Sequence, residues 1–132
     1  MRTPTVELRA FPDSYVIARF PADSPVPGEL LAAHPGDAFV SFTRTPQEVS
    51  IVCPVQLAPA GAELDGPWVG LYAGGPIPFG LTGVVASLVA PLAAAACPVF
   101  VVSTFDGDIL MVPASDSGRA RSILAAAGHA VV

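Results

Sequence analysis

GGPIPFGLTGVVASLVAPLAAAA, residues 74–96, is the stretch that decides the fold. No Asp, Glu, Lys, Arg or His occurs between Gly66 and Phe105, so a membrane-spanning helix has to be considered first. A spanning helix needs about 20 continuous apolar residues, whereas prolines interrupt the uncharged run at Pro76, Pro78, Pro91 and Pro98. The segment therefore predicts a helix of a globular domain over residues 81–96.

The two faces of this predicted helix differ in side-chain size. Large apolar residues recur at helical spacing, namely Leu81, Val84, Val85, Leu88, Val89 and Leu92. The other face has small residues, namely Thr82, Gly83, Ala86, Ser87, Ala90 and Ala94. Because small residues let a second surface approach closely, we expect the helix to be covered on both sides, with a kink at Pro91.

Strand and turn signals lie on both sides of the helix. Residues 68–72 read as a strand before it, and residues 98–105 and 108–113 read as two strands after it. Asp106-Gly107 between the latter two is typical of a type I′ hairpin. A second helix is expected between an N-cap at Ser115 and Gly128, followed by a short strand over residues 129–132. The order βαββαβ is the ferredoxin-like arrangement.

The first half of the chain is richer in strands. Alternating residues predict strands over residues 6–10, 14–20, 38–45 and 48–55, with one short helix over 27–33. A connection rich in Ala, Gly and Pro, residues 57–67, separates this half from the second. We therefore expect an α+β protein of two units, residues 1–60 and 61–132, with antiparallel sheets and helices on one face.

The amino-acid composition of the chain limits the kinds of partner and ligand that we expect it to bind. The chain has 132 residues, 52% of them hydrophobic, and a net charge of -5. Nucleic acids and anionic membranes need clustered cations, and the arginines are scattered, so neither partner is expected. With no C-x-x-C and no His at ligand spacing, we expect no metal and no cofactor. Cys53 and Cys97 are expected to be buried free thiols, with a disulfide left open. Glu7 and Arg9 interrupt any apolar leader, which predicts a cytoplasmic protein.

Four segments taken together point to a known family. They are TRTPQEVSIVCP (residues 43–54), GPIPFGLTGVVASLVAPLAAA (75–95), STFDGDILMVP (103–113) and AAGHAV (126–131). They resemble small bacterial proteins with tandem ACT domains, which are similar to the eukaryotic cytosolic arginine sensor and to aspartokinase regulatory domains. The resemblance implies a degenerate ACT-like unit over residues 1–60 and a regular ACT domain over 61–132. It also implies a regulatory or sensor protein that binds a free amino acid or similar metabolite at the interface between ACT units.

Candidate ligand-binding residues come first from the loop before the long helix. A carboxylate favours unpaired backbone N–H groups and a helix N-terminus, and this loop offers Gly75, Phe79, Gly80 and Leu81. The resemblance adds the hairpin residues Thr104, Phe105 and Asp108, together with Ser50 and Ile51 of the first half. Asp108 would receive a cationic or amino group. The arginine-sensing relatives carry an acid in the loop, which residues 77–79 lack here, so arginine specificity is not implied.

Plainer interpretations of the same residues stay open. The glycines and prolines of the loop can simply turn the chain, and Asp106 and Asp108 can simply flank a turn. The alternative function is a protein-interaction or dimerisation scaffold with an ACT-like fold and no ligand, and a homodimer fits either function. An enzyme is not expected, because neither His34 nor His129 has a nucleophile or carboxylate partner at motif spacing. The sequence does not name a downstream protein partner.

Overall fold

The computed structural model describes residues 4–25, 27–32, 35–74 and 82–132. The chain forms two compact units. We call Met1–Phe11 with Val69–Val132 the C-terminal unit, and Pro12–Trp68 the central unit. This division differs from the expected one between residues 60 and 61, because the N-terminal strand pairs with strands of the C-terminal unit.

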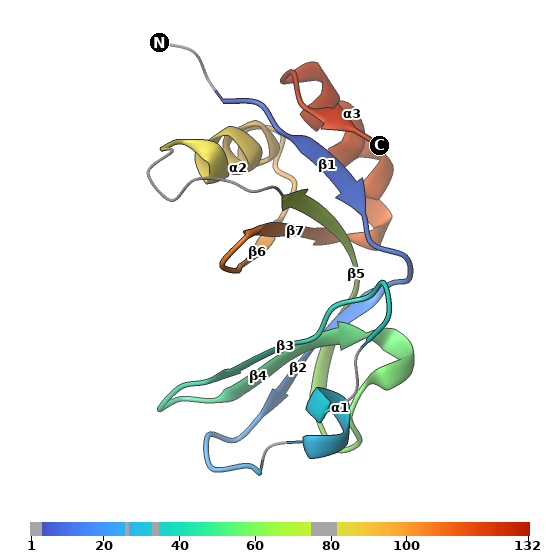
Figure 1. The fold of residues 1–132 in the computed structure, drawn as a ribbon, viewed down its shortest axis with the longest axis vertical. Coiled ribbons are helices and arrows are strands. Elements are labelled where there is room, and N and C mark those ends of the chain that lie inside the picture. The colour runs from blue at the N-terminus through green and yellow to red at the C-terminus, as the bar shows by residue number, and fades with distance from the viewer. Residues whose placement is uncertain (1–3, 26, 33–34, 75–81) are drawn as a thin grey trace. The chain divides into compact units, whose positions relative to one another are not determined.

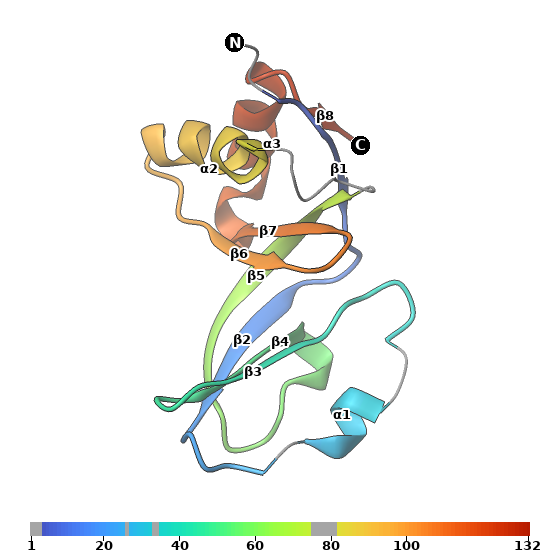
Figure 2. The ribbon, with the colours of Figure 1, turned by 60° about the vertical axis from the view of Figure 1, so that its left-hand side comes forward.

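Figures 1 and 2 show the helices and strands from two directions, and β8 is labelled in Figure 2. The strands are β1 (Glu7–Ala10), β2 (Tyr15–Phe20), β3 (Ser41–Arg44), β4 (Val49–Pro54), β5 (Glu63–Gly74), β6 (Phe100–Ser103), β7 (Gly107–Pro113) and β8 (Ala130–Val131). The helices are α1 (Gly28–Ala32), α2 (Val84–Ala94) and α3 (Ser117–Ala126), with short 3-10 turns η1 (Val55–Leu57) and η2 (Ala114–Asp116).

The C-terminal unit has the expected element order, β5-α2-β6-β7-α3-β8. Its strands lie side by side as β8-β1-β5-β7-β6. β1 is an addition to the ferredoxin-like order: it lies between β5 and β8, antiparallel to the first and parallel to the second. Leu8 is opposite Ala73 on one side and Val131 on the other. The N-terminal strand thus completes the ferredoxin-like sheet of the C-terminal unit.

Both long helices cover one face of this sheet (Figure 1). The core between them is formed by Leu8, Leu71, Ala73, Val84, Leu88, Leu92, Cys97, Leu110, Val112, Ala120 and Leu124. α2 begins at Val84 rather than Leu81, because Gly83 has a φ of 84° and stands outside the helical turn. Pro91 lies inside the helix, as predicted.

The expectation that α2 is covered on both sides is not met. On the small-residue face, Ala86, Ala90 and Ala94 are exposed while Ser87 is buried, so most of this face of α2 is open to solvent. Across the described ranges, no helix has both the length and the apolar character needed to cross a membrane.

The central unit repeats the ferredoxin-like strand order in a reduced form, β3-β4-β2-β5. These neighbours are all antiparallel. Its core consists of alternate residues of β2 and β4, namely Val16, Ala18, Val49, Ile51 and Cys53. α1 contributes Leu30 at the edge of this core, and no residue of α1 is fully buried. This unit is accordingly strand-rich and less regular, as the sequence predicts.

β5 is longer than the predicted strand over residues 68–72. It starts at Glu63, within the segment that was expected to be a connection. The pairing of β5 with β2 is irregular between Tyr15 and Ile17, where β5 has Gly66 and Pro67. A bulge tolerates a proline, which cannot donate a ladder hydrogen bond, so this strand continues through a Gly-Pro pair that normally indicates a turn.

Candidate functional site

The β6–β7 hairpin carries three of the predicted ligand-binding residues. The backbone N–H of Thr104 donates to the carbonyl oxygen of Gly107 at 2.8 Å, and the Thr104 hydroxyl donates to the same oxygen at 3.0 Å. Phe105 and Asp106 therefore form the centre of the turn. The prediction of a type I′ turn at Asp106-Gly107 is wrong, since that turn needs positive φ angles and neither Asp106 nor Gly107 has one.

Gly107 is needed for close packing between strands rather than for the turn. A Cβ at this position would lie 2.5 Å from the carbonyl oxygen of Ala73 and 3.0 Å from the Cα of Gly74. β7 therefore starts directly against the end of β5. A larger residue than glycine would force the two strands apart.

Asp108 is held in place by a neighbour across the hairpin. It pairs with Ser103, whose hydroxyl donates to Asp108 Oδ1 at 2.5 Å. Asp108 is half-buried, and strand alternation places it on the same face as Leu110 and Val112, which pack against α2 and α3. This carboxylate is thus oriented by the protein on the helical face of the sheet, with one hydrogen bond from the described residues.

The remaining predicted residues fall into two groups. Gly75, Phe79, Gly80 and Leu81 lie outside the described residues. Ser50 and Ile51 lie on β4 of the central unit, which β2 and β3 flank on both sides. The Ile51 side chain is fully buried in the core of that unit, while Ser50 is half-buried. Of the predicted set, the structure brings together Thr104, Phe105 and Asp108, and Phe105 is 79% exposed.

Two cavities involve residues that the sequence analysis did not name as sites. The first, of about 340 Å³, lies in the C-terminal unit and is lined by Glu7, Arg9, Tyr72 and Gly74. Arg9 is directly opposite Tyr72, and Arg9 Nη2 lies 2.8 Å from Glu7 Oε1. The signal that could have found it is the alternation of Glu7 and Arg9 around buried Leu8, which puts both charges on one face.

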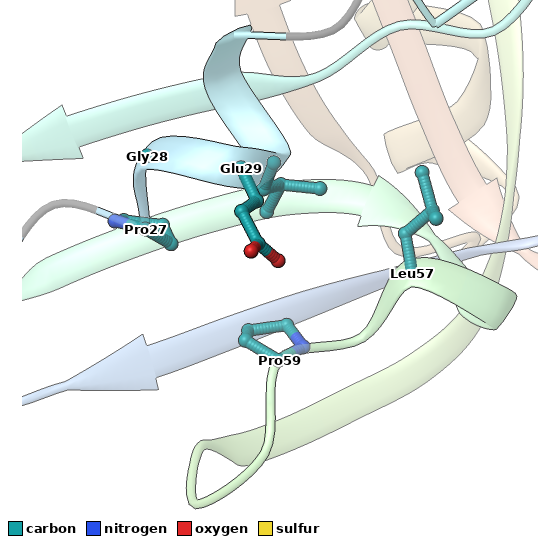
Figure 3. Close-up of a pocket in the computed structure, with 6 residues that line it drawn as sticks. Pro27, Gly28, Glu29, Leu57 and Pro59 are labelled. Carbon is teal, nitrogen blue, oxygen red and sulfur yellow. The ribbon is translucent and has the colours of Figure 1, made fainter.

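The second cavity lies in the central unit and has a volume of about 500 Å³. It is lined by Pro27, Gly28, Glu29, Leu30, Leu57 and Pro59 (Figure 3). Two short segments that are distant in sequence, α1 and the end of η1, form its walls. No sequence motif marks these residues, because proline and leucine in loops are common.

The buried titratable groups are structural. Both cysteines are buried free thiols, as expected, and burial raises the pKa of each. Burial also raises the pKa of Tyr15, although its Oη accepts a hydrogen bond from the Phe39 N–H at 3.1 Å. In the part of the chain that the structure describes, no three His, Cys, Asp or Glu side chains gather into a group that could hold a metal ion.

His129 is a buried residue whose ring nitrogens both have backbone partners. Nδ1 accepts from the N–H of Val6 at 3.2 Å, so Nε2 carries the proton and donates to the carbonyl oxygen of Ser87 at 3.0 Å. A histidine engaged in this way links β1 to α2. Both ring nitrogens are thus engaged in contacts within the C-terminal unit.

Comparison with known proteins agrees with this architecture. The chain is 38% identical to protein Atu0741 from Agobacterium tumefaciens, with a TM-score of 0.87 over 98% of this chain and 93% of that one. It is 16% identical to VC0802 from Vibrio cholerae, with a TM-score of 0.74 over 93% of this chain and 90% of that one.

A similar fold occurs in the ligand-free regulatory subunit of aspartate kinase from Thermus thermophilus. The two are 15% identical, with a TM-score of 0.60 over 95% of this chain and 99% of that one. A sequence comparison with curated proteins gives no match. The family model for the ACT domain matches residues 63–126, which run from β5 to the end of α3. The segment over residues 63–126 therefore matches an ACT domain.

Proposed function

We propose that this protein is a non-enzymatic regulatory or sensor protein that binds a free amino acid or a similar small metabolite. The ligand would contact the β6–β7 hairpin, with Asp108 receiving its amino or other cationic group. Thr104 and Phe105 would contribute the adjoining surface of the turn. The contributions of Gly75, Phe79, Gly80, Leu81, Ser50 and Ile51, and the position between ACT units, stay predictions from the resemblance.

The observation that carries this proposal is the oriented carboxylate of Asp108 in a domain of the ACT family. Ser103 holds one of its oxygens, which fixes the side chain before any ligand arrives. A carboxylate fixed in this way accepts charge-assisted hydrogen bonds from an ammonium group without first losing much side-chain entropy. The aspartate kinase regulatory subunit of similar fold supports a regulatory role.

The test is thermal unfolding of the purified protein against the free amino acids at millimolar concentration. A ligand that binds only the folded protein raises the unfolding midpoint. We expect one or a few amino acids to do so. Asp108→Asn keeps an oxygen for Ser103 but removes the charge, and should weaken that ligand by at least about 1 kcal/mol, or roughly fivefold.

Asp106→Asn is the matched control, because it removes the same charge from an exposed position of the same turn. Its ligand affinity should stay near that of the unmodified protein. Equal affinities for the Asp108→Asn variant and the unmodified protein would contradict the role given to Asp108.

The scaffold function is favoured by one observation, the exposed small residues Ala86, Ala90 and Ala94 on one face of α2. Small side chains on an exposed helix face allow close packing of a second protein surface. The amino-acid panel separates the two functions. A folded, metabolite-free sample that shows no shift with any amino acid would favour the scaffold.

A further inference from the structure

The two units differ in the elements that come after their third core strand. In the C-terminal unit, β7 ends at Pro113 and is followed by η2 and then by the ten-residue helix α3. In the central unit, β4 ends at Pro54 and is followed by η1, after which residues 58–62 lead directly into β5. The central unit thus has the 3-10 turn but no counterpart of α3.

The absence of this helix leaves space beside α1. In the C-terminal unit, α3 packs next to α2 and places Ala120 and Leu124 in the core, both with 0% exposure. In the central unit, the corresponding neighbours are α1 and η1, and the cavity of about 500 Å³ is lined by residues of both. Leu57 at the end of η1 is 46% exposed. The cavity therefore occupies the place where a second helix would cover this unit.

The lining of this cavity is apolar except for one charge. Glu29 is the sole ionisable residue among the described lining residues, and it takes part in no ion pair or hydrogen bond with the described part of the chain. Figure 3 shows its carboxylate directed from α1 towards Pro59, with Leu57 on the other wall. The cavity thus combines an apolar surface with one available anion.

We propose that this cavity is a binding site for small organic cations, namely primary ammonium compounds with an apolar body of about four to six carbons. The volume lies within the range of about 300–1,000 Å³ that is typical of small-molecule sites. The ammonium group would pair with Glu29, and the apolar body would displace water from Leu30, Leu57 and Pro59. This site is in the central unit and does not involve Asp108, so it is independent of the proposed amino-acid site.

The experiment uses three probes with one carbon skeleton and different charges: 3-methylbutylammonium, 3-methylbutan-1-ol and 3-methylbutanoate. Each is titrated into the ¹⁵N-labelled full chain, and the backbone amide signals are followed by NMR. We expect saturable shifts at Gly28, Leu30 and Leu57 with the ammonium compound. Affinity should decrease from the ammonium to the alcohol and again to the carboxylate.

Glu29→Gln tests the charge while keeping a side chain of the same size, and it breaks no ion pair of the described residues. The substitution should lower the affinity for the ammonium compound to that for the alcohol. We expect a decrease of about two- to fivefold, which is the range for an exposed ion pair. Glu48→Gln is the matched control in the same unit and should leave the affinity unchanged. Asp108→Asn should also leave it unchanged, so loss of the proposed amino-acid function would not affect this result.

Three outcomes would overturn the proposal. If the protein binds the ammonium compound and the alcohol with equal affinity, the site does not select for charge. If the Glu29→Gln variant binds the ammonium compound as tightly as the unmodified protein does, the Glu29 carboxylate has no role in binding. Absence of saturable shifts at the three amides would show that the space is not a small-molecule site and would favour a groove for a partner helix.

Discussion

Tyr72 and two glycines beside it show how single residues set the spacing of the C-terminal sheet. A Cβ on Gly74 would lie 1.9 Å from the Tyr72 ring, and a Cβ on Gly107 would lie 3.0 Å from the Tyr72 hydroxyl. The ring therefore occupies space that two absent side chains leave on β5 and β7. An aromatic ring over strand glycines restores apolar contact where the backbone alone would face solvent.

Substitution of Gly107 by alanine is the direct test of this packing. The new Cβ would meet the carbonyl oxygen of Ala73, which belongs to the backbone and cannot rotate away. We expect Gly107→Ala to lower the free energy of unfolding by about 1–3 kcal/mol, as measured by urea denaturation. Gly118→Ala is the control, because nothing lies within 4 Å of the new Cβ and alanine favours the helix by up to about 1 kcal/mol. An unchanged Gly107→Ala protein would refute the steric argument.

Gly107 also shows a limit of sequence-based prediction. Asp-Gly between two strand-like runs correctly predicts that a hairpin is present. It misplaces the turn by one residue, because a glycine that permits a positive φ looks the same in sequence as a glycine that permits close packing. Only the position of Ala73, 34 residues earlier in the chain, distinguishes the two roles.

At the scale of secondary-structure elements, β1 depends on β8, α2 and α3 for its position. The N–H of Ala130 donates to the carbonyl oxygen of Val6, and the His129 ring joins Val6 to Ser87 on α2. The N–H of His129 itself donates to the carbonyl oxygen of Leu124 on α3. One buried side chain thus connects the N-terminal strand to the helical layer.

Replacement of His129 by leucine should reveal this connection. The variant keeps an apolar side chain of similar size but leaves the Val6 N–H and the Ser87 carbonyl without their partner. Each group left without a partner away from water costs about 1–3 kcal/mol, so we expect the two together to lower the free energy of unfolding by about 2–6 kcal/mol. Hydrogen exchange of the Val6 amide should accelerate more than that of the Ser50 amide in the central unit. Equal acceleration at both would argue against a local connection.

Most elements could be predicted, while the insertion of β1 into the sheet could not. Periodicity predicts α2, α3 and the β6–β7 pair, since these patterns depend on neighbours close in sequence. The insertion of β1 beside β5 depends on pairing between segments far apart in the chain, which no local pattern encodes. Strand alternation also predicts the face of the sheet on which Asp108 lies. The contact between the Ser103 hydroxyl and Asp108 depends on the register of the hairpin, which the sequence does not specify.

At the scale of the whole molecule, two buried thiols and one buried phenol make the stability of the fold decrease at alkaline pH. Burial raises the pKa of Cys53, Cys97 and Tyr15 above their ordinary values of 9.0 for the thiols and 10.0 for the phenol. The folded protein therefore retains these protons at pH values where the unfolded chain releases them. Stability decreases as pH rises when the folded state binds more protons, so the loss begins near pH 9.

We expect the free energy of unfolding to be constant between pH 7 and about 8.5 and to fall progressively above pH 9. Urea denaturation under reducing conditions, followed by circular dichroism, measures this profile. Cys53→Ala should show a shallower decline above pH 9, because one of the three groups no longer titrates. A variant with the same slope as the unmodified protein would assign the decline to other residues.

The position of β1 also bears on how the chain folds while it is being made. β1 leaves the ribosome before both of its partner strands, β5 and β8, and the second of these ends at Val131. The central unit, in contrast, has all of its residues by Trp68. Its sheet can form once Trp68 has been made, whereas β1 must wait for β8 before its second edge is paired. Strand pairing across such a separation is slow, because the chain must close a long loop first. The early-made strand is then a segment that a chaperone could bind during synthesis.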